Sequence, residues 1–310
     1  MIVVTGGAGF IGSNLVKGLN SKGTQDILIV DNLSDSTKHK NMNRLKFSDY
    51  IDYRNFPECL YDYEDIKIIF HLGACADTTG TDGVYMMEKN YDYSKGLLNY
   101  CMETGTRLIY ASSASVYGMG ENGFKEEESA EYPLNIYAFS KYQFDRYVRM
   151  SKACSQVVGL RYFNVYGPQE NHKGRMASVA YKLFRQVKAK EPLTLFEGSE
   201  SFTRDFIHVD DVVKVNLFFM DNPDISGIFN TGTGVSESFK SVADAVEAFY
   251  PGVEVKEVPF PDDLKGKYQK YTCADLTKLR EVGYKGSFLS VSEGVKRYME
   301  VLEKTGGYIL

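Results

Sequence analysis

The sequence has few cysteines and histidines, and neither type is spaced as a structural or metal-binding site requires. Its five cysteines are odd in number and widely separated, and none belongs to a Cys-x-x-Cys pair. This pattern indicates reduced thiols in an internal compartment, and it argues against a disulfide framework and against a zinc site. The four histidines form no metal-spaced pair either, so no metal site is expected.

Long apolar runs and an excess of positive charge are also missing. No stretch approaches the roughly 18 apolar residues of a membrane span, and the chain opens on the strand-like MIVVTGG rather than on a signal peptide. The formal net charge of -5 argues against broad attraction to nucleic acid or to an anionic membrane. We therefore expect a cytoplasmic protein with a small-molecule partner, whose local Arg and Lys clusters can still bind phosphate.

The chain does contain a regular alternation of short apolar runs and amphipathic segments. Strands are predicted at 2–5, 27–31, 66–71, 107–113 and 157–163, and helices at 10–21, 83–104 and 134–152. Apolar strands that alternate with helices are typical of a parallel sheet covered on both faces. The 310 residues are therefore predicted to form an α/β fold with a Rossmann-like, doubly wound parallel sheet.

The pattern changes after Gly167-Pro168, where loops become longer and strands shorter. A helix is predicted near 176–189. The runs RDFIHVDD (204–211) and GIFNTGTG (227–234) look like returns to the first lobe. The expected division is a Rossmann domain over 1–166, with returns near 204–234, and a smaller interleaved, mainly substrate-binding lobe over 167–310.

The first strand runs directly into the glycine-rich turn TGGAGFIG (5–12), which opens the first helix. Gly6 permits a tight turn, Gly9 lets a pyrophosphate approach the backbone, and Gly12 allows close helix–strand packing. The helix N-terminus adds N–H donors and a positive dipole end. Asp31 ends the second strand, where an acid about 20 residues on holds the adenosine ribose hydroxyls. Together these features predict a dinucleotide site.

The residues near Asp31 leave the choice of dinucleotide open. Asp31 by itself favours NAD, since a carboxylate repels a 2′-phosphate. Asn32, Lys38 and Arg54 lie close enough in sequence to supply donors and positive charge for that phosphate. The same three residues are equally well interpreted as solvated surface.

A second group of residues has the pattern of a proton-transfer site. RLIYASS (107–113) places Ser113 at the carboxyl edge of the predicted sheet, where open α/β sheets bind ligands. Tyr137 and Lys141 stand at i and i+4 on one helix face. A tyrosine with its ordinary pKa of about 10 is a poor base at neutral pH, and a neighbouring ammonium would lower that pKa. Tyr137 is therefore the predicted acid/base group, with Lys141 as its activator and Ser113 as the partner of the substrate oxygen.

The glycine turn, the serine strand and the tyrosine–lysine helix, in this order, resemble the extended short-chain dehydrogenase/reductase family, which acts on nucleotide-activated sugars. The resemblance covers essentially the whole chain and includes RYFNVYGP (161–168) and RDFIHVDD (204–211). It implies a substrate contact for Asn164, a diphosphate contact for Arg204 and support of the tyrosine region by Asn90. The residues implied to bind the cofactor are Gly6, Gly9, Phe10, Ile11, Gly12, Asp31, Asn32, Lys38, Arg54, Leu72, Gly73, Ala74, Cys75, Ala76, Asn90, Lys141, Val165 and Lys173.

Within that family the sequence argues against a sugar 4,6-dehydratase. Such members typically place an Asp-Glu pair just after the serine strand in order to eliminate water. Ala114-Ser115 stand there in this chain, so the elimination acid and base are missing. An epimerase needs only reversible hydride transfer and access to both faces of a transient ketone.

The loop GPQENHKGRMAS (167–178) contains a candidate second proton-transfer group, which would decide how both faces of the ketone are reached. The sugar can rotate over one base, as in UDP-galactose 4-epimerase-like members, or a ketone can turn between two proton-transfer groups. Lys173 suits the second route, because a partly desolvated lysine shifts toward neutrality and exchanges protons at about pH 7. His172 is interpreted as a packing or hydrogen-bonding residue.

A closer resemblance is to the ADP-L-glycero-D-manno-heptose 6-epimerase family. It rests on MIVVTGGAGFIGSN, DNLSDSTK, GACADTT, YASSASVYG, NIYAFSK, RYFNVYGPQENHKGRMAS, LFEGSESFTRDF and LKGKYQ. It implies epimerisation of an ADP-heptose at C6″ for lipopolysaccharide core synthesis, with Tyr137 and Lys173 as the two acid/base groups. The residues implied to bind the substrate are Ser113, Asn164, Arg175, Lys182, Phe196, Glu197, Gly198, Ser199, Arg204 and Tyr268.

The same resemblance implies tightly held NADP and a ring-like homo-oligomer, a pentamer. Tyr53 departs from the pattern, since some relatives have there a lysine that faces the 2′-phosphate. Arg54 would substitute for that lysine, and NAD stays open. The alternative functions are a UDP-hexose 4-epimerase, which needs no Lys173, and a non-catalytic dinucleotide-sensing regulator, which tends to lose the tyrosine–lysine pair.

Overall fold

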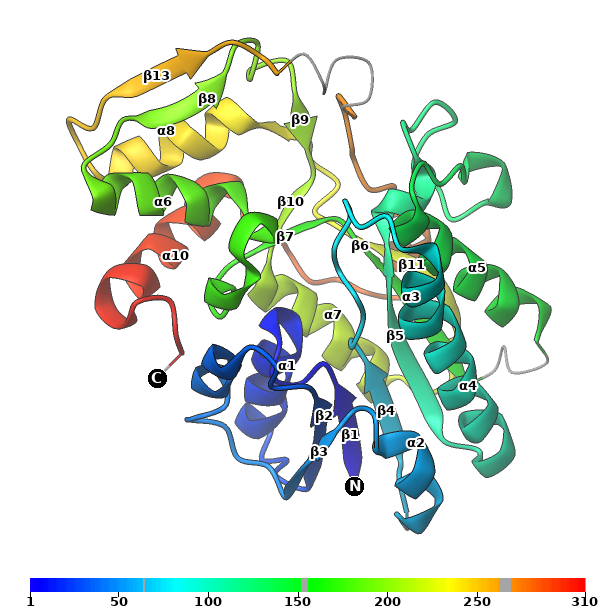
Figure 1. Cartoon of the computed structure of the whole chain (residues 1–310). Helices are drawn as coiled ribbons and strands as arrows, with labels where there is room; N and C mark the ends of the chain where they lie inside the picture. The colour runs from blue at the N-terminus through cyan, green and yellow to red at the C-terminus, as the bar shows by residue number, and fades with distance from the viewer. Residues whose placement is uncertain (64, 152–155, 262–268, 310) are drawn as a thin grey trace.

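The computed structural model describes residues 1–63, 65–151, 156–261 and 269–309. Its largest sheet has seven parallel strands in the order β11-β6-β5-β4-β1-β2-β3, with helices on both faces (Figure 1). The predicted Rossmann-like, doubly wound fold is confirmed. The strands are β1 (Ile2–Thr5), β2 (Ile27–Asp31), β3 (Asp49–Asp52), β4 (Ile68–His71), β5 (Arg107–Ser113), β6 (Val157–Tyr162) and β11 (Gly227–Thr231).

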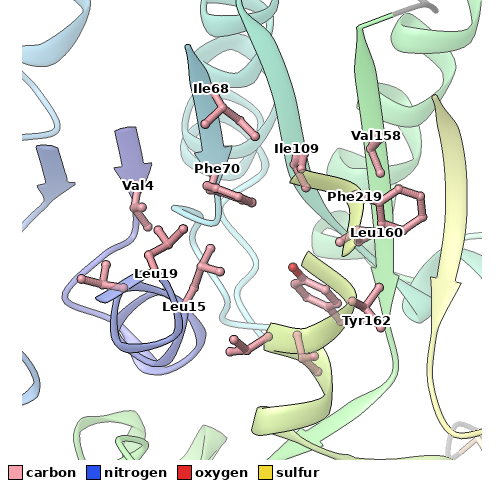
Figure 2. Close-up of a cluster of buried hydrophobic side chains, with 14 of the residues drawn as sticks. Val4, Leu15, Leu19, Ile68, Phe70, Ile109, Val158, Leu160, Tyr162 and Phe219 are labelled. Carbon is pink, nitrogen blue, oxygen red and sulfur yellow. The ribbon is translucent and has the colours of Figure 1, made fainter. Parts of the chain in front are cut away.

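Two apolar layers hold the helices against this sheet, because successive strand residues point to opposite faces. Val4 packs with Leu15 of one helix layer and with the cluster that includes Phe219 (Figure 2). Val3, its neighbour in β1, packs into the opposite cluster with Phe144. Both valines are fully buried, which explains why the strands read as continuous apolar runs. The helices flanking the sheet are α1 (Phe10–Ser21), α2 (Phe56–Cys59), α3 (Gly83–Met87), α4 (Tyr93–Thr104), α5 (Ile136–Met150) and α7 (Val209–Asp221).

A separate apolar cluster forms the core of the second half of the chain, where α6, α8 and α10 gather beside β8 and β13 (Figure 1). Ser178 begins α6 by accepting a hydrogen bond from Tyr181 N–H, so the helix starts at Val179 rather than at 176 as predicted. The elements here are α6 (Val179–Ala189), β8 (Leu193–Phe196), β9 (Thr203–Arg204), β12 (Glu237–Ser238), α8 (Phe239–Phe249), β13 (Val255–Val258), α9 (Thr277–Glu281) and α10 (Val291–Thr305).

One prediction about the elements needs correction. The helix predicted over 83–104 is interrupted by a π-helical turn at Glu88–Asp92, between α3 and α4. The segment 204–211, interpreted as a return to the first lobe, contains β10 (Phe206–His208), which pairs with β7 (Asn164–Tyr166), while β9 pairs with β12. Ile207 of β10 packs in the core cluster that contains Val4. The segment 227–234 does return, since β11 pairs with β6. None of the helices in the described ranges combines the length and apolar character that crossing a membrane needs.

Candidate active site

The glycine-rich turn between β1 and α1 is folded tightly on its own backbone. Gly6 has φ +70°, and a Cβ there would lie 2.7 Å from Gly73 N, so both conformation and space exclude a side chain. A Cβ on Gly12 would lie 2.1 Å from the Gly6 carbonyl oxygen. Gly9 precedes α1 and supplies no side-chain cap, which leaves the first N–H groups of the helix to an anion. The turn therefore fits a dinucleotide pyrophosphate.

Asp31, at the end of β2, binds donors of the chain itself. Its carboxylate accepts hydrogen bonds from the backbone N–H groups of Ala8 at 2.8 Å and Asn32 at 2.7 Å. Lys38 Nζ lies 2.5 Å from Asp31 Oδ1 and donates to Asn32 O at 2.8 Å. Asp31 thus ties the glycine turn to the strand end and neutralises Lys38, and its contact with a ribose stays a prediction.

Tyr53 and Arg54 follow β3, beside that strand end. Arg54 donates to both oxygens of Asp52, at 2.8 Å and 3.1 Å, and its side chain is 72% exposed. The ring of Tyr53 faces Lys89, whose Nζ lies 5.3 Å from the ring centroid. The charge of Arg54 is therefore paired with Asp52, whereas Lys38 is paired with Asp31 at the end of β2.

The loop after β4, residues 72–76, is held from two sides. Gly73 N–H donates to Thr5 Oγ1 at 3.1 Å. The Asn90 amide accepts from Cys75 N–H at 2.8 Å, donates to Cys75 O at 3.0 Å, and donates to Ser140 Oγ of α5 at 3.0 Å. Asn90 lies in the π-helical turn, an irregularity that is frequent at functional sites. Asn90 therefore joins the predicted cofactor loop to the helix that carries Tyr137.

Ser113, the last residue of β5, is hydrogen-bonded to Tyr137 of α5, and Lys141 of the same helix reaches β5 as well. Burial raises the pKa of Tyr137 above its ordinary value, while a hydrogen bond from the Ser113 hydroxyl acts in the opposite direction. Lys141 Nζ donates to Ala111 O at 2.8 Å. Burial lowers the pKa of Lys141 to about 8.

The prediction that Lys141 lowers the pKa of Tyr137 is wrong for this structure. The ammonium donates to a backbone carbonyl of β5, and the net shift of the tyrosine pKa is upward because burial dominates. The i, i+4 spacing places both residues on one helix face. It does not decide which acceptor the long lysine chain reaches, because that depends on the strand beneath.

A buried ion network anchors α5 to the sheet. Asp145, one turn after Lys141, accepts from Arg161 Nε at 2.9 Å. Arg161 lies in β6, is fully buried, and also donates to Glu131, which accepts from Arg149 at 2.8 Å as well. Buried charges of this kind are stable only when each one is paired. The network therefore fixes the helix that carries Tyr137 and Lys141.

The basic loop 167–178 forms the 3₁₀ segment η6 (Asn171–Met176) between β7 and α6. Lys173 Nζ lies 4.9 Å from the centroid of the Phe10 ring, at the start of α1, and 3.9 Å from Glu170 Oε2. Burial lowers the pKa of Lys173; the charge of Glu170 opposes this shift and that of Lys182 adds to it. Lys173 is thus a partly desolvated lysine at the dinucleotide turn, although no described contact joins it to Tyr137.

The neighbours of Lys173 point toward other parts of the site. His172 Nδ1 lies 3.4 Å from Asn41 Nδ2, and its pKa is lowered by burial and then by the nearby lysines. Arg175 donates to Asp77 at 2.6 Å, across 98 residues of sequence, and both side chains are solvent-accessible. This ion pair joins η6 to the segment that follows the predicted cofactor loop.

With this geometry, the sequence pattern of the NAD dependent epimerase/dehydratase family matches residues 2–232. That range contains all seven strands of the large sheet and the Ser113, Tyr137 and Lys141 cluster. The chain belongs to this family. The cofactor class of this family member is accordingly a nicotinamide dinucleotide, for which the glycine turn has the required shape.

Individual relatives are nucleotide-sugar epimerases. This family member is 61% identical, over 318 aligned residues and 100% of both chains, to an ADP-L-glycero-D-manno-heptose-6-epimerase of Brachyspira hyodysenteriae. The crystal structure of the Helicobacter pylori ADP-L-glycero-D-manno-heptose-6-epimerase is 28% identical, with a TM-score of 0.84 over 98% of this chain and 96% of that one. A Thermus thermophilus UDP-glucose 4-epimerase in complex with NAD is 27% identical, with a TM-score of 0.82 over 98% and 99%. The resemblance found in the sequence is confirmed.

Most of the predicted substrate residues of this family member lie in the second half of the chain, in β7, α6, β8 and β9. Asn164 is exposed at the start of β7. Arg204 is nearly buried and donates to Thr203 O at 2.9 Å and to Gln269 O. The Ser199 hydroxyl is buried without a hydrogen-bond partner among the described residues. Of the other predicted substrate residues, Lys182 lies in α6, Phe196 in β8, and Glu197 and Gly198 in the turn after it, while Tyr268 falls outside the described ranges. Val165, predicted to bind the cofactor, lies in β7.

Two carboxylates of this region were not singled out from the sequence. Glu170 is fully buried beside Lys173, and Asp77 pairs with Arg175. Both belong to motifs that carry the family resemblance, GPQENHKGRMAS and GACADTT. Local pattern cannot reveal either role, because a surface carboxylate and a buried one look alike until the chain is folded.

Proposed function

We propose that this chain epimerises ADP-D-glycero-D-manno-heptose at C6″ to ADP-L-glycero-D-manno-heptose, which supplies heptose for the lipopolysaccharide core. The observation that carries the proposal is Lys173, held 4.9 Å from the Phe10 ring at the dinucleotide turn. A one-base epimerase has no use for a second proton-transfer group there. The 61% identity to the Brachyspira hyodysenteriae epimerase supports the same substrate.

The reaction inverts one carbon without net oxidation, so the C6″ hydrogen must leave one face of a carbonyl and return to the other. A nicotinamide dinucleotide held at the glycine turn would supply the hydride acceptor and donor for this exchange. The lowered pKa of Lys173 suits the group that removes the C6″ hydroxyl proton as the ketone forms. The raised pKa of Tyr137 suits the group that donates a proton after the ketone has turned. In the reverse direction the two groups exchange roles.

Ser113 and Lys141 support this proton transfer. Ser113 hydrogen-bonds Tyr137 and stands at the strand end where the substrate oxygen would lie. Lys141, anchored on Ala111 O at 2.8 Å, provides a cation one helical turn from the tyrosine. Both residues therefore hold the acid/base group in place rather than supply the second proton site.

The cofactor in this proposal is NADP rather than NAD. Lys38 Nζ lies 2.5 Å from Asp31 Oδ1, next to the strand end that would hold the adenosine ribose. A 2′-phosphate would give this ammonium a second anionic partner, and the ammonium would offset the repulsion between that phosphate and Asp31. Denaturing the purified protein and identifying the released dinucleotide by mass spectrometry checks the assignment, and NAD as the sole product would overturn it.

The proposal also retains the division of the chain into a nucleotide-binding domain over 1–166, with returns near 204–234, and a substrate-binding lobe over 167–310. It includes a cytoplasmic location and a homopentameric assembly, both carried over from the family resemblance. Sedimentation velocity checks the assembly, and a monomer at micromolar concentration would contradict it.

The decisive experiment follows the C6″ configuration of ADP-D-glycero-D-manno-heptose by proton NMR with wild-type protein and with Lys173→Ala. We expect conversion by the wild type and a loss of about 10²–10⁴-fold in the variant, which is the usual contribution of a general acid or base. Full activity without Lys173 would favour rotation over one base. No conversion by either protein, with cofactor retained, would refute the heptose substrate and direct the assay to UDP-hexoses.

A further inference from the structure

Glu170 is a buried carboxylate between the basic loop and α6. It is fully buried, and its two oxygens accept hydrogen bonds from Ser178 N–H and from the Ser178 hydroxyl, both at 2.6 Å. Lys173 Nζ lies 3.9 Å from Glu170 Oε2, and Lys173 N–H donates to Glu170 O at 2.9 Å. The same side chain therefore touches the start of α6 and the lysine at the dinucleotide turn.

Capping of α6 does not account for a buried charge at this position. The Ser178 hydroxyl already accepts from Tyr181 N–H at 3.2 Å and thereby caps the helix. A buried carboxylate is costly to keep unless an opposite charge compensates it. Among the described residues, Lys173 is the cation that forms an ion pair with Glu170. The carboxylate thus serves the lysine as well as the helix.

The surroundings of Lys173 show what this partner does. On one side the ammonium faces the Phe10 ring, with Nζ 4.9 Å from its centroid. The charged and titratable groups that act on it are Glu170 and His172 from the same loop and Lys182 from α6. Burial and Lys182 both favour the neutral amine, and Glu170 alone favours the ammonium. Glu170 therefore sets both the place of Nζ and the balance between its two protonation states.

We propose that Glu170 is a positioning residue that holds Lys173 against Phe10 and supplies the counter-charge for its protonated form. The inference rests on the proposed function, in which Lys173 removes a proton in one direction of the reaction and donates one in the reverse direction. A lysine without this counter-charge would lose its proton readily and recover it poorly. It would also be free to swing away from the dinucleotide turn.

The test compares Glu170→Gln with Ser178→Ala in the cofactor-loaded protein. Glutamine keeps the shape and can still accept from Ser178 N–H while its amide NH2 donates to Ser178 Oγ, so this variant removes the charge and reverses one hydrogen bond. Ser178→Ala removes the helix cap and one hydrogen bond to Glu170 but leaves the charge in place. For each protein, kcat and KM are measured against pH, and thermal unfolding reports folding. Competitive acetylation against pH, read at the Lys173 peptide by mass spectrometry, reports the titration of this amine without any substrate.

The expected result separates the two roles. Glu170→Gln should lower kcat by about ten-fold, a fraction of the effect of a whole acid/base group, with KM little changed. Its Lys173 acetylation curve and the corresponding limb of kcat should both move to lower pH. Ser178→Ala should lower the unfolding temperature and leave both curves where the wild type has them. An unchanged acetylation curve in folded Glu170→Gln, or the same kinetic defect in Ser178→Ala, would overturn the proposal.

The test still decides the proposal if Glu170→Gln does not fold or if the wild type does not convert ADP-heptose. If Glu170→Gln does not fold, Glu170→Asp keeps the charge but draws it back by one methylene, and the acetylation curve should again move to lower pH. A curve identical to the wild type in Glu170→Asp would then overturn the proposal. If the wild type converts no ADP-heptose, the proposed function fails, whereas the acetylation comparison still decides whether Glu170 governs Lys173.

Discussion

His71 is predicted to make the folded protein sensitive to acid. Its imidazole is buried at the end of β4, with Nδ1 2.7 Å from Thr5 Oγ1 and Nε2 2.8 Å from Ser94 Oγ. Ser94 donates to Asn90 O at 2.6 Å, so it accepts from Nε2–H. Thr5 accepts from Gly73 N–H at 3.1 Å and donates to Nδ1. A proton on Nδ1 would leave the threonine hydroxyl without its acceptor, so the site is built for the neutral ring.

The size of the effect follows from the change in protonation on unfolding. Burial lowers the pKa of His71 from 6.5 to about 3. The unfolded chain therefore binds a proton below about pH 6.5 that the folded chain binds only below about pH 3. Because the folded-state pKa is depressed, stability is present above this window and is lost as the pH falls through it. Between about pH 7 and pH 5 the loss amounts to about 2 kcal/mol.

Urea denaturation of the wild type and of His71→Gln at these two pH values checks this prediction. The variant lacks the titrating ring, so the wild type should lose about 2 kcal/mol more than the variant between about pH 7 and pH 5. His39→Gln serves as the control, because it makes the same substitution at an exposed histidine. Equal acid losses in the wild type and His71→Gln would refute the buried neutral imidazole.

Two further predictions concern the buried charge network and the glycine turn. Arg161→Met should lower the free energy of unfolding by about 3–5 kcal/mol, since it leaves Asp145 without a cation in the core and Glu131 with Arg149 alone, and a loss under about 1 kcal/mol in urea denaturation would contradict this. Arg149→Met, at a side chain 22% exposed, should cost less. Gly12→Ala should release the bound cofactor and destabilise the turn by about 1–3 kcal/mol, because its Cβ would meet the Gly6 oxygen at 2.1 Å. Gly96→Ala, with open space around its Cβ, should retain cofactor, and retention by Gly12→Ala as well would count against the reasoning.

The parts of the fold that the sequence predicts well are those in which burial is complete. The predicted strands 2–5, 27–31 and 107–113 coincide with β1, β2 and β5, whose residues lie mostly in the core. Strand β3 was missed, because Asp49–Asp52 forms a partly exposed edge strand with an aspartate at each end. An edge strand is paired on one side only, and the side chains of β3 are at most half-buried, so they carry little apolar pattern.

The candidate site likewise has features that the sequence predicts and features that depend on the folded structure. Its glycine turn and its serine–tyrosine–lysine cluster were predicted, because local geometry dictates glycine at Gly6 and helix spacing brings Tyr137 and Lys141 to one face. The upward shift of the Tyr137 pKa was not predicted, because it depends on burial and on the acceptor that Lys141 binds in β5. The ion pair between Lys173 and Glu170 was not predicted either, because it forms only when η6 packs against the start of α6.

The π-helical turn at Glu88–Asp92 makes the length of this helical segment as important as its composition. A π turn holds one residue more than an α turn, and one residue corresponds to about 100° of rotation around a helix. Deleting a single residue there would make the helix regular, but it would swing Asn90 away from Cys75 and Ser140 or else turn α4 away from the sheet. A perfectly regular helix is therefore incompatible with the hydrogen bonds by which Asn90 holds Cys75 and Ser140. Substitutions in this segment should be tolerated far better than insertions or deletions of one residue.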